Sequence, residues 1–176
     1  MTRDEFEYLL ITCEKDIYKL CFRLTGNKEQ ADELFQDTWL SALENVRHIS
    51  PEKNPKSYLF GKAISLWKTK RRKYARRQQI APKTDLADEL EEVFFISNAQ
   101  TPEEVVLDNE LTDCLKKEVS LLKEKYRVVV ELYYALELSA PEIANILKIP
   151  KGTVESRLYK ARKLLKCRME EHGYEI

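Results

Sequence analysis

"KIPKGTVESRLYKARKLL", Lys148 to Leu165, begins with a Pro and a Gly and continues as a basic run with a regular apolar stripe. From Lys151 to Arg168 it carries 7 basic side chains, and Glu155 is the one acidic side chain. Apolar residues recur at helical spacing, so we expect an amphipathic helix with one buried face. Such a helix is either a solvated basic surface or a reader of a polyanion.

The preceding segment, "SAPEIANILK", predicts a second, shorter helix. Ser139 and Glu142 stand in capping-box register, so this helix is expected to begin at Ser139. Lys148, Ile149 and Pro150 form the turn between the helices, which is the arrangement of a helix-turn-helix. The residues expected to pack across it are Ile143, Ala144 and Leu147 on the first helix and Val154, Leu158 and Leu165 on the second.

The start of the second helix has the side chains of a DNA reader. In a helix-turn-helix this end meets base edges in the major groove. Gly152 lacks a Cβ that would hold the backbone away from a phosphate, and Thr153 and Ser156 offer hydroxyls. Longer reach comes from Glu155, Arg157, Tyr159 and Lys160. These residues favour duplex DNA binding over a merely solvated helix.

The zero net charge of the 176-residue chain conceals blocks of alternating sign. Residues 1–50 carry net charge −4, residues 51–80 net +9, residues 81–118 net −8 and residues 119–176 net +3. Two basic blocks separated by an acidic one indicate two contacts with a polyanion, joined by a segment that avoids it.

The N-terminal part also reads as helical. One helix is expected from about Asp4 to Leu24, ended by Gly26, and a second, capped by Asn27, from Lys28 to about Val46. Residues 47–56 contain two prolines and predict a loop, after which Ser57 is expected to cap a third helix. Little glycine and long runs of good helix formers predict an all-α protein.

The third helix, "SYLFGKAISLWKTKRRKYARR", interleaves aromatic side chains with cations. Cations attract a phosphate chain and aromatic faces stack on unpaired bases, so this pattern suits a single-stranded nucleic acid. The aromatic residues are Tyr58, Phe60, Trp67 and Tyr74, and some of them must belong to the core. We therefore expect two small helical domains, 1–78 and 110–176, joined by an acidic linker at 79–109.

Several other classes of protein are disfavoured. No 18-residue apolar run occurs, and "MTRDEFEYLL" does not have the basic start and apolar core of a signal peptide, so we expect a cytoplasmic protein without membrane insertion. Neither a catalytic constellation nor a cofactor site is evident. The cysteines do not have metal-site spacing, and we expect four buried reduced thiols and no metal: Cys13, Cys21, Cys114 and Cys167.

Three segments in this order resemble the extracytoplasmic-function (ECF, group IV) branch of sigma factors, the promoter-recognition subunits of bacterial RNA polymerase. Region 2.2 resembles "ADELFQDTWLSAL", and regions 2.3 and 2.4 resemble "YLFGKAISLWKTKRRK". Region 4 is similar to "YRVVVELYYALELSAPEIANILKIPKGTVESRLYKARKLL", where Pro-x-Gly-Thr-Val-x-Ser-Arg-Leu-x-x-Ala-Arg is the most specific signature.

The resemblance implies three functional surfaces. Docking on core polymerase would use Asp32, Glu33, Gln36 and Asp37. Capture of the melted −10 strand would use His48, Asn54, Lys56, Ser65, Trp67, Lys68, Arg71 and Arg72. Recognition of the −35 duplex would use Lys151, Gly152, Thr153, Glu155, Ser156, Arg157, Tyr159, Lys160 and Lys163. It further implies an anti-sigma factor as a partner, often a membrane-bound one.

The chain departs from the family pattern in places. Ser65 stands where many members have Asn, Trp67 is bulkier than the usual residue, and Glu155 replaces a frequent Lys or Arg. A carboxylate cannot pair with a phosphate, but it accepts a hydrogen bond from cytosine N4.

Two alternatives remain open from the residues. A helix-turn-helix repressor or activator that is not a polymerase subunit should have a dimerisation helix or a ligand-binding domain, and we see neither. A DNA-acting enzyme such as a recombinase should have clustered carboxylates or a nucleophile beside arginines.

Overall fold

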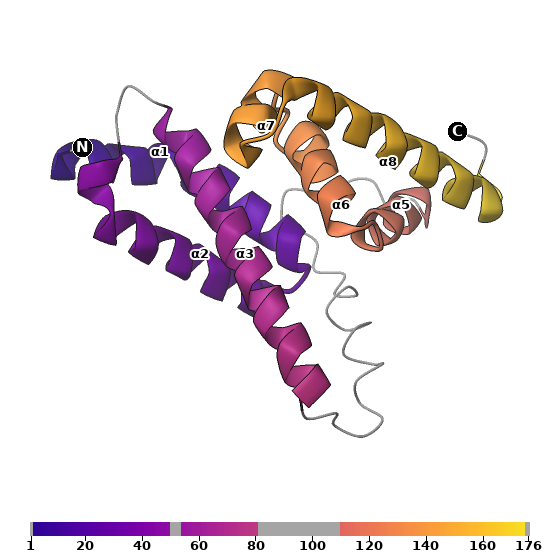
Figure 1. Cartoon of the computed structure of the whole chain (residues 1–176), viewed down its shortest axis with the longest axis horizontal. Helices are drawn as coiled ribbons and strands as arrows, with labels where there is room; N and C mark the ends of the chain where they lie inside the picture. The colour runs from indigo at the N-terminus through magenta and orange to yellow at the C-terminus, as the bar shows by residue number, and fades with distance from the viewer. Residues whose placement is uncertain (1, 50–53, 81–109, 175–176) are drawn as a thin grey trace.

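The computed structural model describes residues 2–49, 54–80 and 110–174. All regular structure in these ranges is helical, which confirms the predicted fold class. The helices from the two halves of the chain lie side by side, with α1, α2 and α3 in one group and α5 to α8 in the other (Figure 1). Most of the predicted acidic linker, beyond residue 80, lies outside the described residues.

The N-terminal group begins as the sequence predicts. Helix α1 spans Arg3–Thr25, where the Thr2 hydroxyl accepts a hydrogen bond from the Glu5 N–H at 3.2 Å and the Glu5 carboxylate accepts one from the Thr2 N–H. Gly26, with φ 69°, ends α1 in the left-handed conformation that glycine adopts without steric cost. Asn27 caps α2, Lys28–Glu44, and a short 3-10 turn at Val46–His48 follows.

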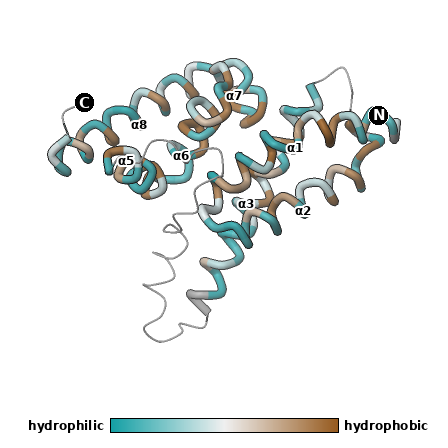
Figure 2. Tube along the Cα trace, turned by 180° about the vertical axis from the view of Figure 1, so that it is seen from behind, coloured by the Kyte–Doolittle hydropathy of each residue, from teal (hydrophilic) through white to brown (hydrophobic). Residues whose placement is uncertain are grey.

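Helix α3 spans Pro55–Ile80, and its start differs from the prediction. The Asn54 side chain, not that of Ser57, accepts the hydrogen bond of the helix start, from the Ser57 N–H at 3.1 Å. Proline suits the first helical position because its fixed φ is helical and its missing N–H is not needed there. The cap therefore lies three residues earlier than predicted, and the basic end of α3 projects away from the other helices (Figure 2).

The C-terminal group contains α5 (Glu110–Ser120), α6 (Glu124–Val130), α7 (Ala140–Leu147) and α8 (Lys151–Glu171). After α6 the helix widens into a π-helical turn, η2, at Glu131–Ala135. The Leu138 N–H closes this stretch on the Leu132 carbonyl at 3.1 Å, and Glu137 follows the turn with φ 53°. Sequence periodicity alone predicts an ordinary helix here.

Helices α7 and α8 form the predicted helix-turn-helix. The Ser139 N–H and hydroxyl both donate to the Glu142 carboxylate, at 2.8 and 2.6 Å. These hydrogen bonds lower the pKa of Glu142, because they favour the charged form. Ile143, Val154 and Leu158 are buried as expected, but Leu165 packs elsewhere, with Leu122, Val130 and Ala161. The prediction for Leu165 was wrong because α8 continues past α7 onto α5 and α6.

The two groups share one hydrophobic core. Buried residues from α1, α2 and α3 are continuous with buried residues from α6, η2, α7 and α8. Helix α3 packs against α7, and α1 packs against η2. Apolar segments of both groups face this junction in Figure 2. The structure thus holds the two groups together as one packed body.

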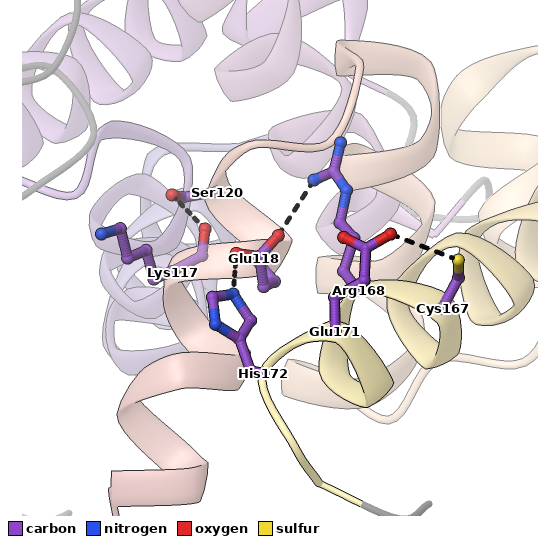
Figure 3. Close-up of polar contacts among 7 residues, drawn as sticks. All are labelled: Lys117, Glu118, Ser120, Cys167, Arg168, Glu171 and His172. Carbon is purple, nitrogen blue, oxygen red and sulfur yellow. Dashed lines mark hydrogen bonds and ion pairs between the residues drawn. The ribbon is translucent and has the colours of Figure 1, made fainter.

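A buried carboxylate fastens the end of α8 to α5. Glu118 is 6% exposed and lies between Arg168 Nη1 and His172 Nε2, each 3.1 Å from one of its oxygens (Figure 3). The charge of Arg168 and the polar contact with His172 offset the cost of burying the carboxylate.

The cysteines differ from expectation. Cys13 and Cys21 are buried, but Cys114 is partly exposed and Cys167 is exposed, so the prediction of four buried thiols was wrong. Burial raises the pKa of Cys21 to about 12, which keeps that thiol protonated and unreactive. Among the described helices, none is both long and apolar enough to cross a membrane.

Candidate nucleic-acid interface

The exposed start of α8 is the first candidate surface. Pro150 precedes the helix with φ −59° and ψ 144°, so the backbone enters α8 extended. A Cβ built on Gly152 would meet nothing within 4 Å, which leaves the backbone open to an approaching phosphate. The first N–H groups of a helix have no partner within it and carry partial positive charge. This end of α8 therefore suits an anion.

On this part of α8 some side chains are buried against the other helices and others are exposed to solvent. Val154 and Leu158 are buried and hold the helix against the core. Tyr159 is 69% exposed, unusually high for a large aromatic residue. Thr153 and Arg157 are half-buried, and the exposed predicted contacts are Lys151, Gly152, Glu155, Ser156, Tyr159, Lys160 and Lys163.

Two polar contacts within α8 hold exposed side chains of this surface in the absence of DNA. The Glu155 carboxylate pairs with Lys151 at 3.3 Å, one turn earlier, and both side chains remain more than half exposed. The Ser156 hydroxyl donates to the Thr153 carbonyl at 3.0 Å, which leaves its oxygen able to accept. Exposed ion pairs of this kind contribute little, so DNA can displace Lys151 at small cost.

Tyr134 is a neighbour of this surface that sequence reasoning missed. Its hydroxyl accepts a hydrogen bond from Arg162 Nε at 2.7 Å, and it is 54% exposed. The Arg162 guanidinium also lies over the rings of Tyr133 and Tyr134, at 5.6 and 5.7 Å from their centroids. The π-helical turn places both tyrosines beside α8, and periodicity gave no signal for it.

The second candidate surface is the acidic side of α2. Lys70 of α3 joins two of its carboxylates, with Nζ 3.1 Å from Glu33 and 2.7 Å from Asp37. Burial opposes the charge of Lys70, but these hydrogen bonds outweigh it and raise its pKa. Asp32 accepts a hydrogen bond from the Tyr18 hydroxyl at 2.8 Å. Gln36 is exposed. The four predicted docking residues thus share one helix, and three of them have partners in the free chain.

Leu40 and Leu43 extend this side of α2. They are 59% and 54% exposed and follow Gln36 and Asp37 at helical spacing. They lie beside the buried residues of α2, which are Ala31, Leu34, Thr38, Trp39 and Ala42. An acidic stripe beside two exposed leucines is typical of a protein-docking surface.

The third candidate surface is α3 with the loop before it. Ser65 and Arg72 are exposed, and Lys68 and Arg71 are about one-third exposed. Trp67 is only 2% exposed, and Phe60 is also core, so neither aromatic face is open to a base in this arrangement. Tyr58 and Tyr74 are half-buried. Lys56, predicted to lie in the loop, is in the first turn of α3 and is paired with Asp16. Asn54 caps α3 and His48 ends the 3-10 turn, while residues 50–53 lie outside the described residues.

Comparisons with known sequences match both halves of the chain. The family described as "Sigma-70 region 2" matches residues 10–77, and "Sigma-70, region 4" matches residues 112–165. A chain that has a region 2 bundle followed by a region 4 helix-turn-helix is a sigma-70-type transcription factor.

Curated relatives narrow this class to a family. "ECF RNA polymerase sigma factor SigL" of Mycobacterium tuberculosis is 30% identical over 160 residues, which are 89% of this chain and 84% of that protein. "ECF RNA polymerase sigma factor SigW" of Bacillus subtilis is 28% identical over 173 residues, 96% of this chain and 91% of that protein. The chain belongs to the ECF family of RNA polymerase sigma factors.

Solved structures agree on the fold. A Bartonella quintana sigma factor, RpoE, crystallised with the anti-sigma factor NepR, matches with TM-score 0.75 and 24% identity over 94% of this chain and 97% of that one. CnrH, in complex with the cytosolic domain of CnrY, matches with TM-score 0.65 and 16% identity over 97% and 90%. At these levels of sequence identity, the two structures show that the fold is similar and nothing more.

Proposed function

We propose that this protein binds core RNA polymerase and directs it to promoters, with α8 reading the −35 duplex and α3 holding the melted −10 strand. The observation that carries the proposal is the open, basic start of α8 within a chain of the ECF family. Its work is differential binding, and we assign it no catalytic residue, cofactor or metal.

At the −35 element, the proposed base contacts are Glu155, Ser156, Tyr159 and Lys160. They lie on the exposed side of α8, and the buried Val154 and Leu158 fix that side outward. Thr153, Arg157 and Lys163, together with the backbone at Lys151 and Gly152, are assigned to packing and phosphates. Contacts to phosphates position a helix, while contacts to base edges give specificity.

At the −10 element, α3 supplies the cations for the displaced strand. Lys68, Arg71 and Arg72 follow each other along the helix, and Ser65 is exposed beside them. Unstacking bases costs free energy, which stacking and phosphate contacts offset. Because Arg127 of the C-terminal group lies over the ring of Trp67, which is only 2% exposed, this function requires the two groups to separate on polymerase.

Docking on core polymerase is assigned to α2. Glu33, Gln36 and Asp37 are at least partly exposed, and Leu40 and Leu43 add apolar area beside them. Charged groups steer the encounter and apolar groups supply most of the burial at such interfaces.

We also propose control by an anti-sigma factor, with the sigma factor itself acting in the cytoplasm. One similar structure is a complex of the sigma factor RpoE with the anti-sigma factor NepR, and the other is a complex of CnrH with the cytosolic domain of CnrY. A regulator that binds both groups of helices at once would prevent both α3 and α8 from binding DNA.

Run-off transcription on sheared genomic DNA of the source organism tests the function. Core polymerase supplemented with this protein should produce new transcripts whose start sites share −35 and −10 sequences. Core polymerase alone, and core with a variant carrying Lys160→Glu and Lys163→Glu in α8, should not. Identical transcripts in all three reactions would refute the proposal.

A further inference from the structure

The C-terminal group covers the proposed strand-binding side of α3 with complementary charge. The Glu124 carboxylate of α6 lies 3.3 Å from Lys68 Nζ and 3.7 Å from Arg71 Nη1. One acidic group thus bridges two cations that the proposed function assigns to the phosphates of the −10 strand. A carboxylate there has the charge and hydrogen-bonding capacity of a phosphate oxygen pair.

An arginine occupies the aromatic surface beside these ion pairs. The Trp67 ring lies under the guanidinium of Arg71, 5.0 Å from its centroid, and under that of Arg127 from α6, at 5.8 Å. Planar guanidinium groups stack on aromatic faces as nucleobases do. Arg127 therefore lies where an unpaired base would stack on Trp67.

Arg127 is anchored in the N-terminal group. It is 3% exposed, and its Nη2 donates to the carbonyl of Arg23 at 2.7 Å, near the C-terminal end of α1. The carbonyls at a helix C-terminus carry partial negative charge and favour a cation. Desolvation nevertheless lowers the pKa of Arg127 to about 10, so burying this cation is costly.

Two further features describe the joint, the contact between the two groups of helices: the backbones approach closely, and one buried hydrogen-bond donor has no partner in the described residues. A Cβ on Gly61 of α3 would lie 3.2 Å from the Ile146 carbonyl oxygen of α7, so the absence of a side chain permits this approach. Trp67 Nε1 is buried without a hydrogen-bond partner in the described residues. A buried unpaired donor destabilises the closed arrangement, and exposure to solvent or a ligand would satisfy it.

We propose that α6 acts as an internal competitor of the −10 strand: Glu124 substitutes for phosphate at Lys68 and Arg71, and Arg127 substitutes for a base on Trp67. This inference rests on the proposed function, which assigns this side of α3 to DNA. The closed chain binds single strands weakly, and its apparent affinity falls with the fraction of open molecules. Engagement of polymerase by both groups of helices would separate them and expose this side of α3.

Charge reversal at Glu124 tests the competitor. Glu124→Lys places a cation against Lys68 and Arg71, so the groups should separate. We expect a larger radius of gyration by small-angle X-ray scattering. We also expect about three- to tenfold tighter binding of a fluorescein-labelled 20-nucleotide single strand of random sequence, measured by anisotropy at constant salt. Glu124 is a partly exposed side chain at the surface, so the variant should fold.

Glu170→Lys is the matched control. It makes the same change in net charge and also breaks one ion pair, that of Glu170 with Lys166 at 3.7 Å, but it lies at the far end of α8. It should leave the radius of gyration and the single-strand affinity close to the wild type. Equal tightening in both variants would show a net-charge effect and overturn the proposal, as would a Glu124→Lys chain that behaves like the wild type.

A triple variant separates this inference from the proposed function. Lys68→Glu and Arg71→Glu added to Glu124→Lys restore opposite charges across the joint, so the scattering profile should return to the closed form while strand binding stays weak. If the triple variant remains open, the ion pairs do not hold the joint. If Lys68→Glu with Arg71→Glu alone supports full run-off transcription, the assignment of α3 to DNA fails instead.

Discussion

Glu155 is the residue whose chemistry departs most from its surroundings. It is the only acidic side chain between Lys151 and Arg168, and it lies exposed near the N-terminal end of α8. We expect Glu155→Ala to relax discrimination at one −35 base pair by roughly 1–3 kcal/mol, because a direct hydrogen bond to cytosine N4 would be lost.

Transcription from a library randomised across the −35 element measures this. Glu170→Ala is the control, since Glu170 and Glu155 each form an i,i+4 ion pair on the same helix, with Lys166 and Lys151. Unchanged preference at every −35 position in Glu155→Ala would remove this residue from base recognition.

The capping box of α7, formed by Ser139 and Glu142, gives two predictions about stability, and the second depends on pH. Ser139→Ala should lower the free energy of unfolding by about 1 kcal/mol at pH 7, because a capping hydroxyl is lost.

The pKa of Glu142 is lower in the folded state than its ordinary value. Its stabilisation is therefore complete above that ordinary value and disappears as the pH falls through the lower, folded-state pKa.

Urea unfolding of Glu142→Gln and wild type across this acidic range tests the linkage. The difference between the two chains in the free energy of unfolding should be constant near neutral pH. It should shrink as the pH falls below the ordinary pKa of glutamate. A difference that grows on acidification would contradict the assigned direction.

At the scale of single residues, local patterns predicted most helix caps, but not that of α3, and not the partners of buried side chains. Asn27, Gly26 and the Ser139–Glu142 pair act as the sequence indicates, because each depends on neighbours within a few positions. The burial of Trp67 and Arg127 could not be predicted, because it depends on contacts between residues far apart in the chain.

Among the helices, α2 carries the docking prediction. Glu33→Lys with Asp37→Lys should weaken co-purification with core polymerase by at least about tenfold, or about 1.4 kcal/mol, because an attractive charge pattern becomes repulsive. A pull-down with immobilised core polymerase measures it. The matched control is Glu14→Lys with Glu170→Lys, the same charge change at exposed positions outside α2.

Loss of the fold must be separated from loss of docking in this experiment. Both carboxylates pair with Lys70, so their reversal also removes contacts between α2 and α3. Circular dichroism and thermal unfolding should show the double variant folded at the assay temperature. A folded double variant that still co-purifies would place the docking surface on another helix.

The contact between α5 and α8 makes a separate prediction about stability. Glu118→Ala should cost about 2–3 kcal/mol, because it leaves Arg168 and His172 without their shared carboxylate at a partly buried site (Figure 3). Arg168 is 35% exposed, which keeps the cost below that of a fully buried pair. Urea unfolding checks it, and Glu171→Ala, at an exposed neighbouring position, should change stability little.

Element by element, periodicity predicted helices well and their mutual packing poorly. The ranges of α1, α2 and α7 lie close to the expected ones, because an amphipathic repeat is a local property. Helix α8 begins at Lys151 as expected but continues to Glu171. The π-helical turn at Glu131–Ala135 and the position of Leu165 were missed, because each reflects the fit of α6 and α8 to other helices.

For the whole molecule, charge blocks indicated two nucleic-acid contacts, and the structure shows how the two helices proposed to make them, α3 and α8, are placed in the free chain. The second contact surface, α8, is open at its start, while the first, on α3, is covered by α6. The sequence suggested separate domains because the intervening residues are acidic and aperiodic. A shared core between them could not be inferred from composition.

The central claim is that α8 places the protein on the −35 duplex and α3 holds the melted −10 strand. Permanganate reactivity of thymines, measured beside DNase protection in complexes with core polymerase, reports the two events separately. The account predicts that Lys68→Glu with Arg71→Glu retains −35 protection but loses reactive thymines at −10. It also predicts that Lys160→Glu with Lys163→Glu loses both. Normal −10 reactivity in the first variant would contradict the account.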